Sequence, residues 1–197
     1  MGSKLQTTVI IIRHAEKLPW DRGLTPHKDV KAAYIDNHVL SAKGYERAQA
    51  FVAYFQCRQE MAALLRARPW GAVIAQDVDS EGGWGKSERP RETVDPLMRA
   101  PTMKDVPFIL YKKSDADHMV NSILSGKYCG KTVLISWCHQ MIPELAKQLG
   151  IPPSSVPEWD KKRFDVTWVL NLDGRNSSFT QIPQRLLYGD LDVPMPV

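Results

Sequence analysis

The 197-residue chain is poor in cysteine. It has three, Cys57, Cys129 and Cys138, which is an odd number with no close pair. The count excludes a disulfide-rich scaffold, and the wide spacing excludes a CxxC metal site. Few, unpaired cysteines are typical of a reducing compartment, so we expect a cytoplasmic protein.

Long hydrophobic runs are also missing. The apolar run near the N-terminus covers residues 9–12 only, and no later stretch is long and apolar enough for a membrane helix. Such a helix needs about 18 or more apolar residues, and the core of a signal peptide needs about 7. We therefore expect neither a signal peptide nor a membrane partner.

An excess of charge of one sign is absent as well. Lys and Arg number 26 against 22 Asp and Glu, for a formal charge of +4. No run of Lys or Arg and no basic–aromatic stripe accompanies this mild basicity, so the sequence predicts no nucleic-acid partner. An anionic small molecule would suit the balance better.

What is present is the pattern of a globular α/β domain. Hydrophobic residues make up 43% and charged residues 24%, and the length predicts a single domain over residues 1–197. Three short segments are apolar on both faces, as buried parallel strands require: 8–12, 72–75 and 132–136. A fourth strand is predicted at 166–170, followed by a turn and a partner strand at 179–182.

Helices are predicted between these strands. Ser41 is a candidate N-cap for a helix over residues 42–65, and Gly150 is a stop signal for one over 140–149. Shorter helices are expected at 93–98 and at 118–124, the latter capped by Asp115 or Asp117. Alternating strands and helices predict a three-layer sandwich with a mostly parallel central sheet. Loops are expected at 18–38 and 76–86, and the tail at 189–197 is expected to wrap the surface or fray.

The strongest chemical signal lies where strands end. Arg13 and His14 directly follow the strand at 8–12, and His139 follows the one at 132–136. The carboxyl ends of parallel strands are where such sheets bind ligands. Arginines hold phosphate oxygens in a two-pronged grip, and a neutral imidazole is a competent nucleophile when its other nitrogen is held by a carbonyl. A second histidine, if protonated, can stabilise the developing charge.

Four landmarks in this order resemble the histidine phosphatase superfamily, which is also called phosphoglycerate-mutase-like. They are the strand followed by Arg-His-Ala-Glu-Lys at 13–17, LSAKGYERAQA at 40–50, SERPRETVDPL at 87–97 and VLISWCHQMIPELAKQLG at 133–150. The resemblance implies that His14 accepts the phosphoryl group, with Arg13 and His139 in the same pocket. The family pattern has an arginine four residues before a threonine. Arg89 meets it ahead of Thr93, which favours Arg89 over Arg91.

The chain departs from the larger branches of that superfamily. Phosphoglycerate mutases carry Arg-His-Gly and a later catalytic glutamate, whereas Ala15 stands here and no Glu-rich motif lies between residues 97 and 132. Acid phosphatases and phytases carry His-Asp or His-Glu, whereas Gln140 follows His139. The compact layout is similar to short bacterial phosphohistidine phosphatases. Candidates for the general acid are Asp115, Asp117, Glu16 and Glu92, and a good leaving group would need no strong acid.

Other residues are candidate substrate contacts with a structural alternative for each. Lys17 is a phosphate contact or a solvated charge, and Glu16 a contact or a positioning group. Ser87 is a phosphate donor or a helix cap, and Trp84, in a glycine-rich stretch, flanks the pocket or anchors the loop. The histidines His27, His38 and His118 are interpreted as surface residues, although His27 and His38 could also touch the substrate. Cys138 is interpreted as a packing residue. No spacing indicates a metal site.

Together these signals predict a phosphatase that needs neither metal nor cofactor and works through a phosphohistidine on His14. Its substrate is a phosphorylated small molecule or a phosphoprotein. One alternative is a mutase-type phosphotransferase, against which the short chain argues because it leaves little room for a lid. The other is a non-catalytic phospho-ligand or protein-binding member of the fold. The sequence leaves the substrate and the oligomeric state open.

Overall fold

The computed structural model describes residues 6–17, 38–79 and 87–197. These residues form one six-stranded sheet in the order β3-β2-β4-β1-β5-β6. The strands are β1 (Gln6–Arg13), β2 (Trp70–Gln76), β3 (Phe108–Tyr111), β4 (Thr132–Trp137), β5 (Val166–Asp173) and β6 (Ser178–Pro183). The pairs β1·β4, β2·β4 and β2·β3 are parallel, whereas β1·β5 and β5·β6 are antiparallel. The prediction of a mostly parallel sheet is thereby confirmed.

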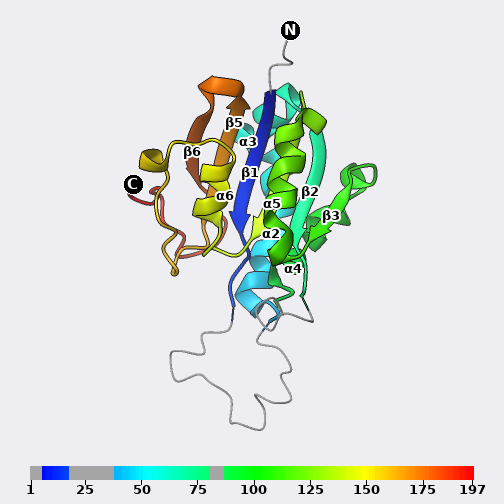
Figure 1. The fold of residues 1–197 in the computed structure, drawn as a ribbon. Coiled ribbons are helices and arrows are strands. Elements are labelled where there is room, and N and C mark those ends of the chain that lie inside the picture. Colours follow the sequence, from blue (N-terminus) through cyan, green and yellow to red (C-terminus); the bar gives the residue numbers. More distant parts are fainter. Residues whose placement is uncertain (1–5, 18–37, 80–86) are drawn as a thin grey trace.

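Helices cover both faces of the sheet, which makes three layers (Figure 1). They are α2 (Ala42–Cys57), α3 (Gln59–Ala67), α4 (Arg89–Met98), α5 (Ala116–Ser122) and α6 (Ile142–Gln148). Alternate residues of β1 show the division: Val9 and Ile11 pack with α5 and α6, whereas Ile10 and Ile12 pack with α2, α3 and α4. Because both faces are buried, the consecutive residues 9–12 of β1 are all apolar.

The structure differs from the sequence-based prediction in two elements. The predicted helix over 42–65 is two helices, because Arg58 adopts an extended backbone (φ −67°, ψ 130°) between α2 and α3. The Arg58 guanidinium donates to the Gln184 carbonyl oxygen and to the Glu60 carboxylate, which stabilises the break. Strand β3 was not predicted, because it is a four-residue edge strand with only partly buried side chains.

Other boundaries agree with the sequence more closely. Helix α2 has its Ser41 cap, whose hydroxyl accepts from the Gly44 N–H, and α6 stops before Gly150, whose φ of +96° suits glycine. Asp115 precedes α5 without capping it through its side chain. The tail packs rather than frays, since Met195 is buried and exchanges backbone–side-chain hydrogen bonds with Gln181. Of the described helices, none has the length and apolar character that crossing a membrane requires.

Candidate active site

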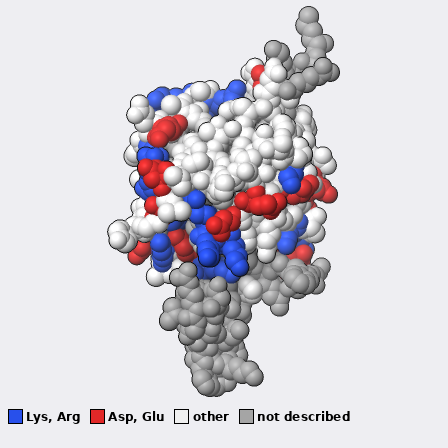
Figure 2. All heavy atoms as spheres, turned by 90° about the vertical axis from the view of Figure 1, so that its left-hand side faces the viewer, with Lys and Arg blue, Asp and Glu red and all other residues white. Residues whose placement is uncertain are grey.

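A cavity of about 240 Å³ lies at the edge of the sheet where the four parallel strands end. Residues at or just after the carboxyl ends of β1, β2, β3 and β4 contribute to its wall, together with the start of α4. The described lining is Arg13, His14, Lys17, His38, Gln76, Ser87, Arg89, Lys113, Cys138, His139 and Gln140. Lys and Arg side chains gather at the same end of the molecule on the face shown in Figure 2.

His14 is held with one ring nitrogen occupied. Its backbone N–H continues the pairing of β1 with β4 by donating to the Trp137 carbonyl oxygen at 3.0 Å, and its Nδ1 lies 2.8 Å from the Ala15 carbonyl oxygen. A carbonyl can only accept, so Nδ1 carries the proton and Nε2 keeps its lone pair. Burial, followed by the charges of Arg13 and Arg89, holds the His14 pKa well below its ordinary value. The ring is therefore neutral at pH 7, as a nucleophile must be.

Arg13 is buried beside it and anchored by main chain from a distant segment. Its Nη1 donates to the carbonyl oxygens of Lys161 and Arg163 at 2.7 and 2.9 Å, and its guanidinium lies 3.7 Å from the ring centroid of Phe164. Burial, and then the charge of Arg89, lower the Arg13 pKa to about 9, which leaves it protonated at neutral pH. Two like charges on one cavity wall favour an anion in that cavity.

The arginine–threonine spacing has a structural explanation. The Thr93 hydroxyl donates to the Arg89 carbonyl oxygen at 2.7 Å and accepts from the Ala15 N–H at 2.8 Å. It thereby ties the first turn of α4 to the end of β1, which brings Arg89 onto the cavity wall. Arg91 instead faces Asp95 and is half-exposed. The structure thus places the arginine that the sequence favoured at the cavity.

His139 lies just after β4 and lines the same cavity. Burial, then the charges of Arg13 and Lys17, lower its pKa to about 4. At neutral pH the ring is uncharged among these cations, in contrast to the protonated form that the sequence led us to consider. A bound dianion would raise this pKa by offsetting the nearby positive charge.

Several buried polar atoms on the cavity wall have no hydrogen-bond partner in the described part of the chain. They are Arg13 Nε, Gln76 Oε1, Ser87 Oγ and His139 Nδ1. Buried polar groups are almost always paired, so a cluster of orphans around one cavity indicates a polar ligand. No Asp or Glu appears in the described lining.

The predicted carboxylate candidates lie elsewhere. Glu16 pairs with Arg47, Glu92 accepts from the Leu40 N–H and the Tyr45 hydroxyl, and Asp117 accepts from Gln148. Asp115 is exposed before α5. None of the four lines the cavity, so their positions favour neither substrate contact nor acid catalysis there. Ser87 and Lys17 do line it, whereas Trp84 and His27 lie outside the described residues.

Sequence reasoning missed three residues of the wall: Gln76, Lys113 and Gln140. Gln76 ends β2 and Gln140 follows His139, so the strand-end rule that selected His14 would also have found them. Lys113 was missed because β3 was missed. Cys138, interpreted from the sequence as a packing residue, does pack on the core but also lies on the cavity wall, and burial raises its thiol pKa. His38 lines the cavity and His118 stacks edge-on against Tyr111.

Comparisons with known proteins find similarity in structure but not in sequence. No family model and no curated protein matches the chain. An Escherichia coli K-12 protein assigned as an alpha-ribazole-5′-P phosphatase aligns over 92% of this chain and 98% of its own, with a TM-score of 0.56 and 12% identity. The Shigella flexneri alpha-ribazole phosphatase aligns over 93% and 100%, with a TM-score of 0.56 and 11% identity.

A third solved structure, assigned as the phosphohistidine phosphatase SixA of Agrobacterium tumefaciens, covers 84% of this chain and 92% of its own at a TM-score of 0.45 and 16% identity. The two ribazole phosphatases match the sheet and its helices over nearly the whole chain. The chain therefore has the phosphoglycerate-mutase-like fold of the histidine phosphatases.

Proposed function

We propose that this chain is a metal-independent phosphatase that forms a phosphohistidine on His14. The observation that carries the proposal is the His14 ring itself. It is neutral, its Nδ1–H is bound to the Ala15 carbonyl, and it lies on a cavity whose wall also carries Arg13 and Arg89. Only Nε2 is left for the substrate, which is the arrangement that nucleophilic attack on phosphorus needs.

In the proposed reaction, Arg13 and Arg89 hold the phosphoryl oxygens, and His139, Ser87 and Gln76 supply further hydrogen bonds. His14 Nε2 attacks phosphorus, the bond from phosphorus to the leaving oxygen breaks, and its electron pair departs with the leaving group. The Nδ1–H bond to Ala15 stabilises the positive charge that the ring acquires. Water then attacks phosphorus, releases phosphate and restores neutral His14. The cations, rather than a metal, stabilise the transferring group.

The leaving group takes up a proton from water or leaves as an anion. Because no carboxylate is found in the described lining, a leaving group of low pKa suits this cavity best. The reaction class agrees with the names of the two ribazole phosphatases that share the fold. We propose a phosphorylated small molecule or a phosphoprotein as the substrate of this chain.

The test is turnover of p-nitrophenyl phosphate by the wild type, by His14→Ala and by His118→Ala. His118 is a matched control because it is a histidine near the same sheet that contacts the Tyr111 ring and does not line the cavity. We expect His14→Ala to lose turnover by at least about a thousandfold and His118→Ala to keep the wild-type rate. Rapid quenching should trap an acid-labile, alkali-stable phosphoryl group on the wild type and on His118→Ala, but not on His14→Ala.

Two results would contradict the proposal. Equal rates for wild type and His14→Ala would exclude His14 as the nucleophile. Inorganic phosphate that binds the wild type, with no hydrolysis across a panel of phosphoesters and phosphoanhydrides, would instead indicate a phospho-ligand-binding module.

A further inference from the structure

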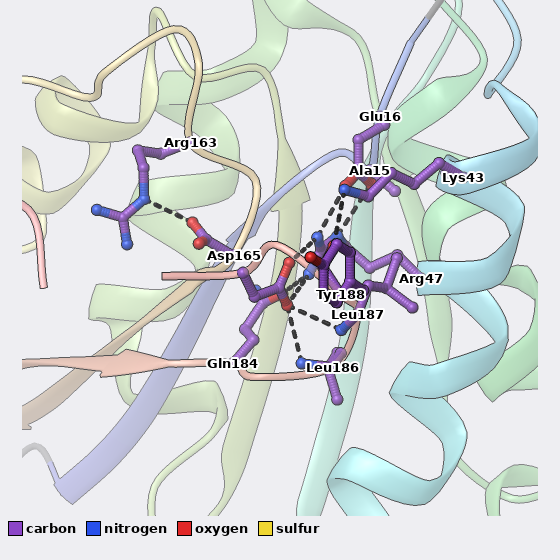
Figure 3. A network of polar contacts seen from close by, with 12 residues as sticks. Ala15, Glu16, Lys43, Arg47, Arg163, Asp165, Gln184, Leu186, Leu187 and Tyr188 are labelled. Carbon is purple, nitrogen blue, oxygen red and sulfur yellow. Dashed lines mark hydrogen bonds and ion pairs between the residues drawn. The ribbon is translucent and has the colours of Figure 1, made fainter. Parts of the chain in front are cut away.

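A second cluster of charges lies beside the cavity and is centred on Arg47 of α2 (Figure 3). The Arg47 side chain is 1% exposed. Its Nε and Nη2 donate to the two carboxylate oxygens of Glu16 at 2.9 and 2.7 Å, and its Nη1 and Nη2 donate to those of Asp190 at 3.0 and 2.6 Å. Nη1 also donates to Gln184 Oε1 at 2.9 Å. We call Arg47, Glu16, Asp190 and Gln184 the arginine network.

The charges of this cluster stabilise one another, so Arg47 and Asp190 stay ionised in the folded protein. Burial lowers the Arg47 pKa, but the hydrogen bonds that Arg47 donates to Glu16 and Asp190 outweigh this effect and hold the pKa above its ordinary value. Burial raises the Asp190 pKa, and the bonds from Arg47 and the Leu186 and Leu187 N–H groups bring it below its ordinary value. The arginine network keeps its geometry because its hydrogen bonds share Arg47, so a shift of this side chain would break several of them at once.

The network reaches His14 through the main chain that orients it. The Ala15 carbonyl that holds His14 Nδ1 belongs to the peptide between Ala15 and Glu16. On the far side of that peptide the Glu16 carbonyl accepts from the Ser41 N–H at 2.9 Å and from the Ser41 hydroxyl at 3.1 Å. A Cβ at Gly44 would overlap the same oxygen, so α2 packs directly against this backbone. The Glu16 side chain, which is bound by Arg47, is a further anchor.

The C-terminal segment completes both supports of the cavity. Asp190 bonds Arg47 and so reaches Glu16. One residue later the Leu191 N–H donates to Asp165 Oδ2 at 2.6 Å, and the Arg163 side chain bonds both Asp165 and the Val193 carbonyl. The Arg163 carbonyl in turn accepts from Arg13. The C-terminal segment therefore supports Glu16 through Arg47, and Arg13 through Asp165 and Arg163.

We propose that Arg47, Glu16 and Asp190 are positioning residues that fix the Ala15–Glu16 peptide and thereby the orientation of the His14 ring. The C-terminal segment is then a working part of the site. This positioning role rests on the proposed function only because that function makes His14 the reacting group. The effect of the network on the orientation of the His14 ring can be tested even if the protein has no phosphatase activity.

The experiment compares Asp190→Asn and Glu16→Gln with Asp192→Asn. Asp192 lies in the same tail but pairs with Arg185 at the surface, with a side chain that is 70% exposed. For both network variants we expect kcat for p-nitrophenyl phosphate to fall about tenfold or more, because small displacements of a reacting group are costly. The inhibition constant for inorganic phosphate should change less than threefold, because Arg13 and Arg89 remain. Asp192→Asn should match the wild type.

A pH profile and a spectrum separate positioning from mere stability. The charged and titratable groups that face His14 are Arg13 from β1, Arg89 from α4 and His139 after β4. They are unchanged in these variants, so loosening the peptide acts mainly by exposing the ring. The acidic limb of kcat/KM should move upward toward pH 6.5. In a ¹⁵N–¹H spectrum of the histidine rings, the His14 Nδ1–H tautomer should dominate in the wild type and give way to a mixture in the variants.

Arg47→Lys and Arg47→Met provide a second route, since lysine keeps the charge but not the fork. We expect Arg47→Lys to recover part of the kcat that Arg47→Met loses. The proposal is overturned if the variants melt at lower temperature yet keep the wild-type kcat, acidic limb and His14 spectrum. An inactive wild type would overturn the proposed function alone, because the His14 spectrum still reports whether the network orients the ring.

Discussion

The two charged clusters at the end of the sheet differ in how their charges are satisfied. In the arginine network each charged group bonds another group of the protein, at distances of 2.6 to 3.0 Å around Arg47. In the cavity, polar atoms of Arg13, Gln76, Ser87 and His139 lack partners in the described part of the chain, and the described lining has cations but no carboxylate.

The difference indicates a division of labour. A network whose members bond one another can hold a backbone in place. A cluster of like charges with unfulfilled hydrogen bonds is costly until an anion joins it. Glu16 and His14 are only two residues apart, yet they belong to different clusters, and this contrast can be tested by removing one member at a time.

Among the variants that compare the two clusters, the largest effect is expected from removing a cation from the cavity. Arg89→Ala should lower kcat/KM for p-nitrophenyl phosphate by about 10²–10³-fold, the range for loss of one donor to a developing oxyanion. Arg91→Ala, two residues along the same helix, is the matched control and should stay near wild type because Arg91 pairs with Asp95 at the surface. Equal losses in both variants would mean that helix α4, not the cavity, is being damaged.

Removing the centre of the arginine network should act first on stability. Arg47→Met leaves two carboxylates without their buried partner, and breaking a buried ion pair costs about 3–5 kcal/mol. Urea unfolding would measure the loss in free energy of unfolding. A change below about 1 kcal/mol, the range of a surface ion pair, would show that the network is not the tight unit described above.

Removing the Thr93 hydroxyl, which ties the first turn of α4 to the end of β1, should have a smaller effect. Thr93→Val keeps the shape but leaves the buried Ala15 N–H without an acceptor, at a cost of about 1–3 kcal/mol. We expect lower stability together with reduced kcat, since Arg89 and Ala15 lose their common tie. Thr93→Ser, which keeps the hydroxyl, should recover most of both, and thermal unfolding with turnover assays checks this.

The smallest effect is expected in the pH dependence of stability, which reports on the histidines of the cavity. The pKa values of His14 and His139 are lower in the folded protein than the ordinary value near 6.5, so below that value the unfolded chain binds more protons. Stability should be full above about pH 6.5 and fall as the pH drops toward 4. Saturating phosphate should reduce the fall, and His139→Asn should do so without phosphate. Melting temperatures from pH 4 to 7 measure it, and a flat profile would contradict the depressed pKa values.

Much of the fold follows from local pattern. The runs around Val9, Val133 and Ala72 are short, apolar and rich in β-branched residues, which favours buried strands. The stop at Gly150 needs only its own φ of +96°. The break at Arg58 was not predictable in the same way. No Pro or Gly marks it, and it is stabilised by Gln184, which lies 126 residues later. Strand β3 was missed because four partly buried residues carry too little periodicity.

The sequence by itself determined where the reactive groups stand along the chain: Arg13 and His14 after one strand, His139 after another, and Arg89 four residues before Thr93. Parallel strands then bring those ends to one edge, whatever lies between them. Only the tertiary structure decided the orientation of each side chain. Glu16 turns from the cavity to Arg47, 31 residues away, and Asp190 reaches the same arginine across 143 residues. Such pairings depend on distances in space, which no local spacing encodes.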